Sequence, residues 1–282
     1  MSVDQDILDG KLLKLKASLE KMGSALVAYS GGVDSTLLLK AAHDALGDKA
    51  LAVMAVSQLT SRQDREDARK IAETIGAAYT FVDVDDLADP ALAANGRDRC
   101  YHCKKRRFGR LKEMAGRRGL AHVVDGTNRD DLDDYRPGLK AMRELGIRSP
   151  LSESGFNKDD IRRMSRSLGL STWDKPALAC LASRIPYGRR ITAEKLKQVD
   201  EGEIFLRSLG ICRQVRVRHH GSVARLEVDP RYLSAFMEDD IRIRIPPYFK
   251  KLGFQFVALD LEGYAMGSLN HEIVPKEGNR NG

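Results

Sequence analysis

Six consecutive residues near the start of the chain have the composition of a phosphate-binding loop. They follow the apolar run 25–29 and read Ser30-Gly31-Gly32-Val33-Asp34-Ser35. Glycines let a backbone approach phosphate oxygens, while serine hydroxyls and the free N–H groups of a helix start donate to them. A carboxylate here would repel phosphate unless it helps to hold Mg²⁺, so Asp34 indicates a Mg²⁺-bound polyphosphate. The alternative is a plain Gly-Gly turn before a capped helix.

Two further polar segments follow apolar runs and are expected near this loop. Ser57 directly follows the run 50–56, and Gly126 and Thr127 follow the short run 122–124. Ligands of parallel sheets bind beyond the carboxyl ends of the strands, so these residues would converge on one edge of the sheet. The next acidic residues are Asp130, Asp131, Asp133 and Asp134. They favour a role near Mg²⁺, with Asp131 as a second ligand, although a solvated acidic loop is the alternative.

The four cysteines suit metal or sulfur chemistry better than disulfides, because a large chain in a reducing compartment seldom has a disulfide framework. Cys100 and Cys103 form a Cys-x-x-Cys pair, which zinc, redox and iron–sulfur sites all use. His102 or His219 would have to complete a zinc site. Three thiolates would hold a [4Fe-4S] cluster with one iron open, and Cys180 is the natural third. Cys212 lies among apolar residues and fits a buried spectator.

Arginines alternate along a predicted hairpin. Two β-rich runs, 214–219 and 223–228, flank a His-Gly turn, and the period of two puts Arg216 and Arg218 on one face. Such a face suits phosphate or carboxylate groups, although a solvated strand face would have the same pattern. The acidic residues Glu203 and Glu227 would either hold a metal or pair with these arginines.

The order of the predicted elements indicates an α/β fold. Strand-like runs at 25–29, 50–56, 79–84 and 122–124 alternate with helical patterns at 36–46, 64–75 and 106–118. This order predicts a Rossmann-like parallel sheet with helices on both faces. A helix at 193–209, the hairpin and a strand at 254–259 predict a smaller C-terminal α+β unit. We expect a phosphate-loop domain at 1–170, a cysteine-bearing linker at 171–190, a substrate or oligomerisation domain at 191–271 and a flexible tail at 272–282.

Composition and charge exclude several classes of protein. Of 282 residues, 42% are hydrophobic and 31% are charged, which is typical of a chain that folds by itself. No apolar run is long enough to span a membrane or to act as a secretion signal, so we expect a cytoplasmic protein. The net charge of +7 suits anionic nucleotides. Since we expect the basic residues to be scattered, nucleic acid is not the favoured partner.

These motifs together resemble one family. The loop 30–35 after an apolar strand matches the pyrophosphate-loop (PP-loop) signature of the adenine nucleotide α-hydrolase group. That resemblance implies cleavage of ATP between the α and β phosphates, with AMP placed on a substrate oxygen. Further matching segments are Asp125-Gly126-Thr127-Asn128, Tyr135-Arg136-Pro137-Gly138, Arg148-Ser149-Pro150-Leu151, Cys180-Leu181-Ala182-Ser183-Arg184 and Val215-Arg216-Val217-Arg218. Over residues 5–270 the chain resembles the LarE family, the ATP-dependent sulfur transferases of nickel-pincer nucleotide cofactor biosynthesis.

The resemblance implies a substrate and site residues. The substrate would be pyridinium-3,5-biscarboxylic acid mononucleotide, whose carboxylates are adenylated and then converted to thiocarboxylates. ATP would be bound by Ser30, Gly31, Gly32, Asp34, Ser35, Ser57, Gly126 and Thr127. The anionic mononucleotide would be bound by Ser183, Arg184, Glu203, Arg216, Arg218 and Glu227. Catalysis would depend on Asp34 and the cysteines.

The resemblance also offers two sulfur sources. Some family members sacrifice the sulfur of the cysteine at the place of Cys180. The set of Cys100, Cys103 and Cys180 instead resembles members in which three cysteines hold a [4Fe-4S] cluster as a renewable source, and we favour the cluster. A homo-oligomer, with a hexamer as one form, and a protein that reloads sulfur are further implications.

Two other functions remain open at this point. A tRNA thiolase would share the adenylation chemistry and the three cysteines, but it needs a nucleic-acid surface, and no RNA-binding module is appended here. A non-catalytic iron–sulfur or zinc protein that senses nucleotide is the third hypothesis.

Overall fold

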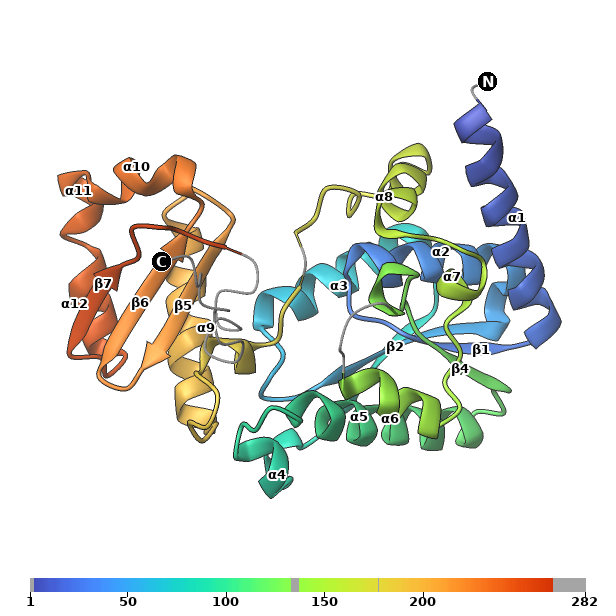
Figure 1. Ribbon diagram of the computed structural model, residues 1–282, viewed down its shortest axis with the longest axis horizontal. Helices are drawn as coiled ribbons and strands as arrows, with labels where there is room; N and C mark the ends of the chain where they lie inside the picture. The colour runs from blue at the N-terminus through green and yellow to red at the C-terminus, as the bar shows by residue number, and fades with distance from the viewer. Residues whose placement is uncertain (1–2, 133–136, 177, 266–282) are drawn as a thin grey trace, which may run out of the picture. The chain divides into compact units, whose positions relative to one another are not determined.

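The structure is a computed structural model that describes residues 3–132, 137–176 and 178–265 (Figure 1). The chain forms two compact units. One comprises Met1–Leu92 and Asp98–Leu178, and the other comprises Ala93–Arg97 and the chain from Ala179 onward. The passage between units at residues 178 and 179 falls inside the segment expected as a linker. Asp133, Asp134, Tyr135, Arg136 and the expected tail 272–282 lie outside the described residues.

The first unit is built on a four-stranded parallel sheet. Its strands are β1 (Ala25–Ala28), β2 (Ala50–Val56), β3 (Tyr79–Asp83) and β4 (His122–Val124), in the order β3-β2-β1-β4. Successive strands run outward from β1 to β3, and the chain then returns to place β4 on the other side of β1. Ligands bind beyond the carboxyl ends of strands at such a reversal. The predicted Rossmann-like parallel sheet is confirmed.

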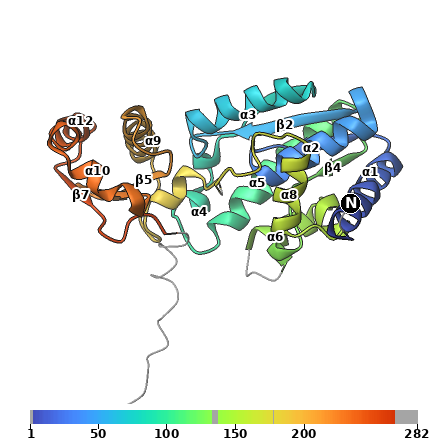
Figure 2. The same cartoon turned by 90° about the horizontal axis from the view of Figure 1, so that it is seen from above.

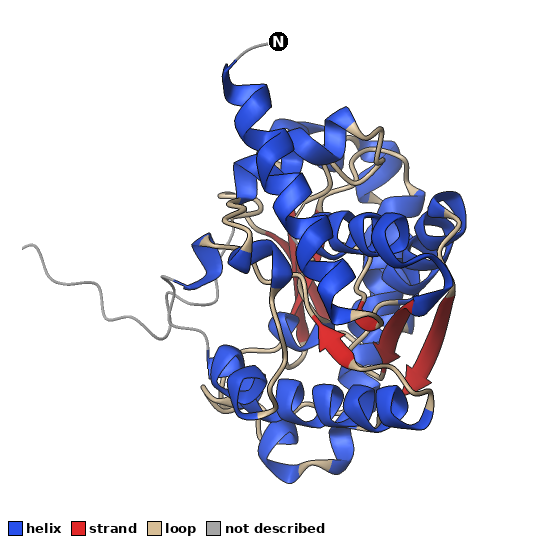
Figure 3. Ribbon diagram, turned by 90° about the vertical axis from the view of Figure 1, so that its right-hand side faces the viewer, coloured by secondary structure: helices blue, strands red, loops and turns tan. Residues whose placement is uncertain are grey.

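Helices cover both faces of this sheet. One apolar layer comes from α1 (Val3–Met22), α2 (Val33–Leu46), α3 (Arg62–Ile75) and α8 (Lys158–Ser167), and the other from α5 (Arg99–Arg117) and α6 (Pro137–Glu144). Shorter helices are α4 (Pro90–Ala93) and α7 (Pro150–Glu153). Figure 2 shows β2 between α3 and α5, and Figure 3 shows strands flanked by helices.

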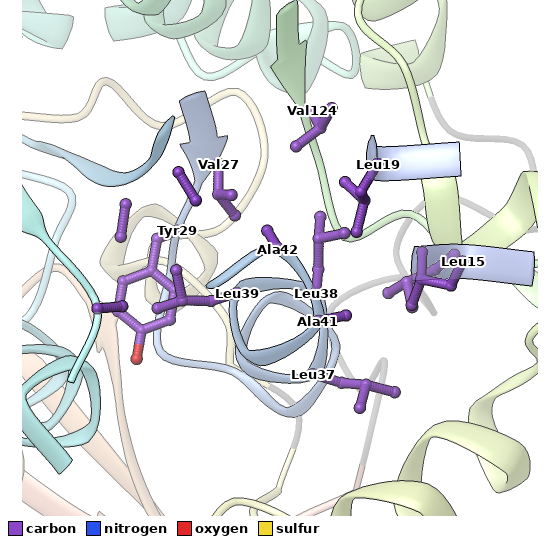
Figure 4. Close-up of a cluster of buried hydrophobic side chains, with 14 of the residues drawn as sticks. Leu15, Leu19, Val27, Tyr29, Leu37, Leu38, Leu39, Ala41, Ala42 and Val124 are labelled. Atoms are coloured by element: carbon purple, nitrogen blue, oxygen red, sulfur yellow. The ribbon is translucent and has the colours of Figure 1, made fainter. Parts of the chain in front are cut away.

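Successive strand residues point to opposite layers, as the strand geometry requires. Val27 joins the layer of α1 and α2, whereas Leu26 joins the layer of α5 and α6. In the first layer, Leu38 of α2 and Leu15 and Leu19 of α1 are fully buried (Figure 4). This core fixes α2, and therefore the phosphate loop before it, against β1.

Helix α5 begins earlier than predicted. The apolar pattern predicted a helix at 106–118 with the cysteine pair before it, but α5 starts at Arg99 and contains both cysteines. The buried apolar residues of α5 are Phe108, Leu111 and Ala115, so only its second half has the apolar periodicity that a sequence pattern detects.

The second unit is a small α+β structure. It contains α9 (Ala193–Ser208), β5 (Val215–His220), β6 (Val223–Val228), α10 (Leu233–Met237), α11 (Asp239–Arg242), α12 (Ile245–Lys251) and β7 (Phe256–Leu259). The predicted hairpin is present as the antiparallel pair β5–β6, and β7 joins β6 in parallel. Helix α9 packs on β5, where Leu206 and Val217 are fully buried.

The substitution Gly202→Ala tests the packing of α9. A Cβ at Gly202 would lie 2.9 Å from Phe249 Cε1 and 3.2 Å from Val217 Cγ2. We expect this overpacking to lower the free energy of unfolding by about 1–3 kcal/mol. The control Gly116→Ala, in α5, meets nothing within 4 Å and should raise it by about 0.5–1 kcal/mol. Urea unfolding followed by circular dichroism measures both, and equal stability of Gly202→Ala and wild type would contradict the described packing.

Candidate active site

The phosphate loop connects β1 to α2 as predicted. Gly32 is the N-cap of α2, and the first N–H groups of the helix have no partner inside it. Ser30 Oγ and Ser35 Oγ lie 3.0 Å apart, and the Ser30 N–H donates to Ser35 Oγ at 3.2 Å. The loop therefore folds back on the amino end of α2, an arrangement that binds anions.

Two glycines of this region are required by close backbone approaches. Gly31 has φ +72°, and a Cβ on it would lie 2.9 Å from the Ala68 Cβ of α3. Gly126 follows β4, and a Cβ there would lie 2.9 Å from the backbone nitrogen of Ser35. The segment after β4 thus passes directly against the start of α2, so the predicted convergence of Gly126 and the phosphate loop is present in the first unit.

Asp34 forms an ion pair with a lysine that the sequence patterns did not indicate. Lys158 Nζ lies 2.8 and 2.6 Å from the two carboxylate oxygens of Asp34. Asn128 Nδ2 also donates to Asp34 at 3.2 Å, and the Asn128 N–H donates to Asp131 at 3.1 Å. The two expected Mg²⁺ ligands are therefore linked through Asn128. Lys158 is the first residue of α8, whose capping box uses Asn157. The sequence indicates this helix start, but it does not indicate the pairing of Lys158 with Asp34, 124 residues away.

Ser57 and Thr127 both bond to buried aspartates. Ser57 follows β2, and its hydroxyl donates to Asp86 Oδ2 at 2.6 Å. Thr127 Oγ1 donates to Asp125 Oδ2 at 2.5 Å. Both residues lie just beyond strand ends, as expected, but their hydroxyls are already used within the protein.

The cysteines fall in different parts of the molecule. Cys100 and Cys103 lie at the amino end of α5 in the first unit, and Cys180 caps the short 3-10 helix η4 (Leu181–Arg184) in the second. Cys100 and Cys180 are exposed and Cys103 is half-buried. Burial raises the pKa of the Cys212 thiol, which fits the expected spectator. Across the described ranges, no three His, Cys, Asp or Glu side chains are gathered as a metal site.

The arginines of the hairpin are not a solvated face, since Arg216 is 7% and Arg218 is 5% exposed. Arg218 Nη2 donates to Glu227 at 2.6 Å, and its Nη1 donates to the Ser183 carbonyl at 2.8 Å. Arg216 lies over the Tyr264 ring. Burial, with Arg184 nearby, lowers the pKa of Arg216.

Glu203 is the second carboxylate of this buried cluster. It accepts from Arg184 at 2.7 and 3.1 Å and from Arg207 at 2.7 Å. Burial by itself would raise the pKa of Glu203, but Arg184, Arg216 and Arg207 outweigh it and lower the pKa to about 2. Glu203 and Glu227 therefore pair with arginines, which was one of the two expected roles.

Among the residues that the structure describes, the ion pairs of this cluster involve more arginines than carboxylates. Its cations are Arg184, Arg207, Arg216, Arg218 and Arg225, and its anions are Glu203, Glu227 and Asp260. Buried charges are costly unless they are compensated. Arg184, Arg216 and Arg218 are buried, whereas the side chains of Arg207 and Arg225 are 24% and 32% exposed.

The expectation of scattered basic charge is wrong. Helix α5 contains eight Lys or Arg residues and one Glu, so its basic residues exceed its acidic residues by seven. The whole chain, with 47 basic and 40 acidic residues, has the same excess. The concentration is on the helix that starts with the cysteine pair. A sequence window of helix length would have detected it.

The sequence of this chain is similar to those of several known proteins. Residues 9–106 match the NAD synthase family. The chain is 46% identical over 268 residues to an uncharacterised protein of Synechocystis, covering 95% of this chain and 100% of that one. It is 40% identical over 265 residues to the pyridinium-3,5-bisthiocarboxylic acid mononucleotide synthase of Lactiplantibacillus plantarum, covering 94% and 95%.

A more distant relative covers about half of the chain. It is a tRNA-specific 2-thiouridylase of Rickettsia felis, 26% identical over 195 residues, covering 56% of this chain and 53% of that one. No helix in the described part of the chain is long and apolar enough to cross a membrane.

The substitution Gly126→Ala tests the close approach to the phosphate loop. The added Cβ would displace the Ser35 backbone, so we expect ATP affinity to fall at least about tenfold, or about 1.4 kcal/mol. Gly109→Ala, with open space around it, is the control and should bind ATP as the wild type does. Isothermal titration calorimetry with ATP measures both affinities. Unchanged affinity in Gly126→Ala would separate this glycine from nucleotide binding.

Glu203 should make the second unit sensitive to acid. Its pKa is about 2 in the folded protein and 4.5 ordinarily, so the unfolded chain binds the proton more tightly. The stabilisation is complete above pH 4.5 and is lost as pH falls toward 2. In Glu203→Gln this dependence should disappear, and stability at pH 7 should fall by about 3–5 kcal/mol because the arginines lose their partner. Urea titrations at several pH values, with exposed Glu238→Gln as the control, test both effects.

Proposed function

The chain belongs to the family of the pyridinium-3,5-bisthiocarboxylic acid mononucleotide synthase, the LarE family, and we propose from this membership that it is an ATP-dependent sulfur transferase. Its substrate would be pyridinium-3,5-biscarboxylic acid mononucleotide, which it would convert to the bisthiocarboxylic form. The observation that carries the proposal is the likeness to the named synthase along nearly the whole of both chains.

In the first step a substrate carboxylate attacks the α-phosphorus of ATP, and pyrophosphate leaves. The N–H groups at the start of α2 and the hydroxyls of Ser30 and Ser35 would bind the departing phosphates. The Lys158 ammonium beside Asp34 reduces the repulsion between that carboxylate and a polyphosphate. Asp34 and Asp131 would bind Mg²⁺, and their link through Asn128 supports this assignment. Ser57, Gly126 and Thr127 would contact the nucleotide at the same edge of the sheet.

The three buried arginines, Arg184, Arg216 and Arg218, support the proposed substrate pocket of Ser183, Arg184, Glu203, Arg216, Arg218 and Glu227. Guanidinium groups bind phosphate and carboxylate groups through paired N–H donors. Glu203 and Glu227 would act here by orienting the arginines, since each accepts two arginine side chains. No metal is assigned to them.

In the second step sulfur replaces AMP on the activated carboxylate. Cys100, Cys103 and Cys180 suit a thiolate-bound [4Fe-4S] cluster, because they are exposed or half-buried and the pair sits at a helix amino end, where negative charge is favoured. When bound, the cluster would supply the sulfur for this step. The alternative is sulfur donated by Cys180 itself, which would be left as dehydroalanine.

The remaining expectations belong to the same proposal: a cytoplasmic homo-oligomer, with a hexamer as one form, and a separate protein that reloads sulfur. The second candidate function is a tRNA thiolase, favoured by the basic helix α5. Filter binding of tRNA over a range of salt concentrations separates the two. A steep loss of affinity with salt would support tRNA, whereas weak binding at all concentrations would leave the mononucleotide as substrate.

The substitution Asp34→Ala tests the first step. With ATP and the biscarboxylate, wild-type protein should release pyrophosphate, and the variant should release it at least about 100-fold more slowly, or about 2.7 kcal/mol in activation free energy. Asp48→Ala, on the surface, should match the wild type. Release that is independent of the biscarboxylate would contradict the proposed substrate.

Anaerobic purification distinguishes the sulfur sources. With a cluster, Cys100→Ala and Cys180→Ala should both lose iron and thiocarboxylate formation while pyrophosphate release continues, and Cys212→Ala should keep all three. With a sacrificial cysteine, intact-mass spectrometry would show Cys180 losing the mass of hydrogen sulfide after one turnover. In that case Cys100→Ala would retain activity, and the cluster would be excluded.

A further inference from the structure

A buried ionic group joins the end of β2 to the cysteine helix within the first unit. Asp86 is 0% exposed and accepts from Arg107 Nε at 2.9 Å and from Arg107 Nη2 at 2.7 Å. Ser57 donates to the same carboxylate at 2.6 Å, and Arg107 Nη2 contacts Ser57 Oγ at 2.7 Å. Each of the three side chains thus bonds to both others.

Ser57 is also the centre of a tight turn beyond β2. Its Oγ accepts the Leu59 N–H at 3.0 Å, and its own N–H donates to Thr60 Oγ1 at 3.2 Å. The turn lies at the carboxyl edge of the sheet, where the nucleotide is proposed to bind. The position of Arg107 is therefore tied to backbone at that edge.

Arg107 lies on the same face of α5 as the cysteine pair. Cys103 precedes it by four positions and Cys100 by seven, which is one and two helical turns. The buried apolar residues of α5, Phe108, Leu111 and Ala115, all lie beyond Arg107. The turns that carry the cysteines therefore contribute no buried apolar residue, and the hydrogen bonds of Arg107 are among the contacts that hold them.

We propose that Arg107 and Asp86 are positioning residues that hold the Cys100–Cys103 pair in register with the nucleotide edge of the sheet. An apolar contact would hold the helix against the sheet equally well, but it would not define rotation and register as directional hydrogen bonds to Ser57 do. The assignment of the cysteines and of that edge rests on the proposed function. The consequence is that sulfur transfer, more than adenylation, depends on this group.

The test compares Arg107→Met and Asp86→Asn with Arg110→Met, a matched change on α5 whose arginine pairs with exposed Glu113 at 2.7 Å. Two quantities are measured at saturating ATP: the rate of pyrophosphate release, and the thiocarboxylate formed per pyrophosphate. In Arg107→Met and Asp86→Asn we expect the second quantity to fall at least about tenfold and the first to stay within about threefold. Arg107→Lys should restore part of the loss, and Arg110→Met should change neither.

A purely structural role would lower the melting temperature and leave the thiocarboxylate yield per pyrophosphate unchanged, which would overturn the proposal. An equal fall of both quantities would also overturn the proposal, because it would show that Arg107 and Asp86 act on adenylation as much as on sulfur transfer. A wild type that makes no thiocarboxylate would refute the proposed function instead. In that case the proposed positioning is tested by the rate at which iodoacetamide alkylates Cys103. This rate should rise severalfold in Arg107→Met and not in Arg110→Met. An unchanged rate in Arg107→Met would overturn the positioning proposal.

Discussion

The proposed nucleotide site depends on one backbone contact, the approach of Gly126 to the start of α2. The strand order β3-β2-β1-β4 places the end of β4 beside the end of β1, and the missing side chain of Gly126 lets the two following segments touch. This contact sets where the next residues lie. Asn128 then reaches Asp34, and Asp131 is held by Asn128. The spacing between phosphate loop and acidic segment is therefore fixed by main chain.

Two kinds of ion pair serve the two units. Lys158 and Asp34 are 36% and 24% exposed in their side chains, so water can reach the pair and a ligand can exchange with it at modest cost. Arg218 and Glu227 are 6% and 0% exposed, and separating them would leave a charge buried without compensation. The Lys158–Asp34 pair therefore suits a site that binds and releases phosphates. The Arg218–Glu227 pair suits a site whose side chains keep one conformation.

Local patterns predicted the elements well and the long-range contacts poorly. The strands β2, β4 and β6 have the predicted bounds, because apolar runs between polar turns define buried strands. The start of α5 was missed because its first turns are polar. Lys158 was missed for a different reason: it is 124 residues from Asp34, and no local pattern records such a pairing. Sequence spacing placed Arg216 and Arg218 on one face, but only the packed unit shows that this face is buried.

The buried arginines link the proposed substrate binding to folding. Arg184, Arg216 and Arg218 are held in the interior of the second unit, so an anion that pairs with them would bind the folded state and not the unfolded chain. A ligand that binds only the folded state stabilises it by RT ln(1 + [L]/Kd). Substrate would therefore add to the stability of the second unit as its concentration rises above Kd.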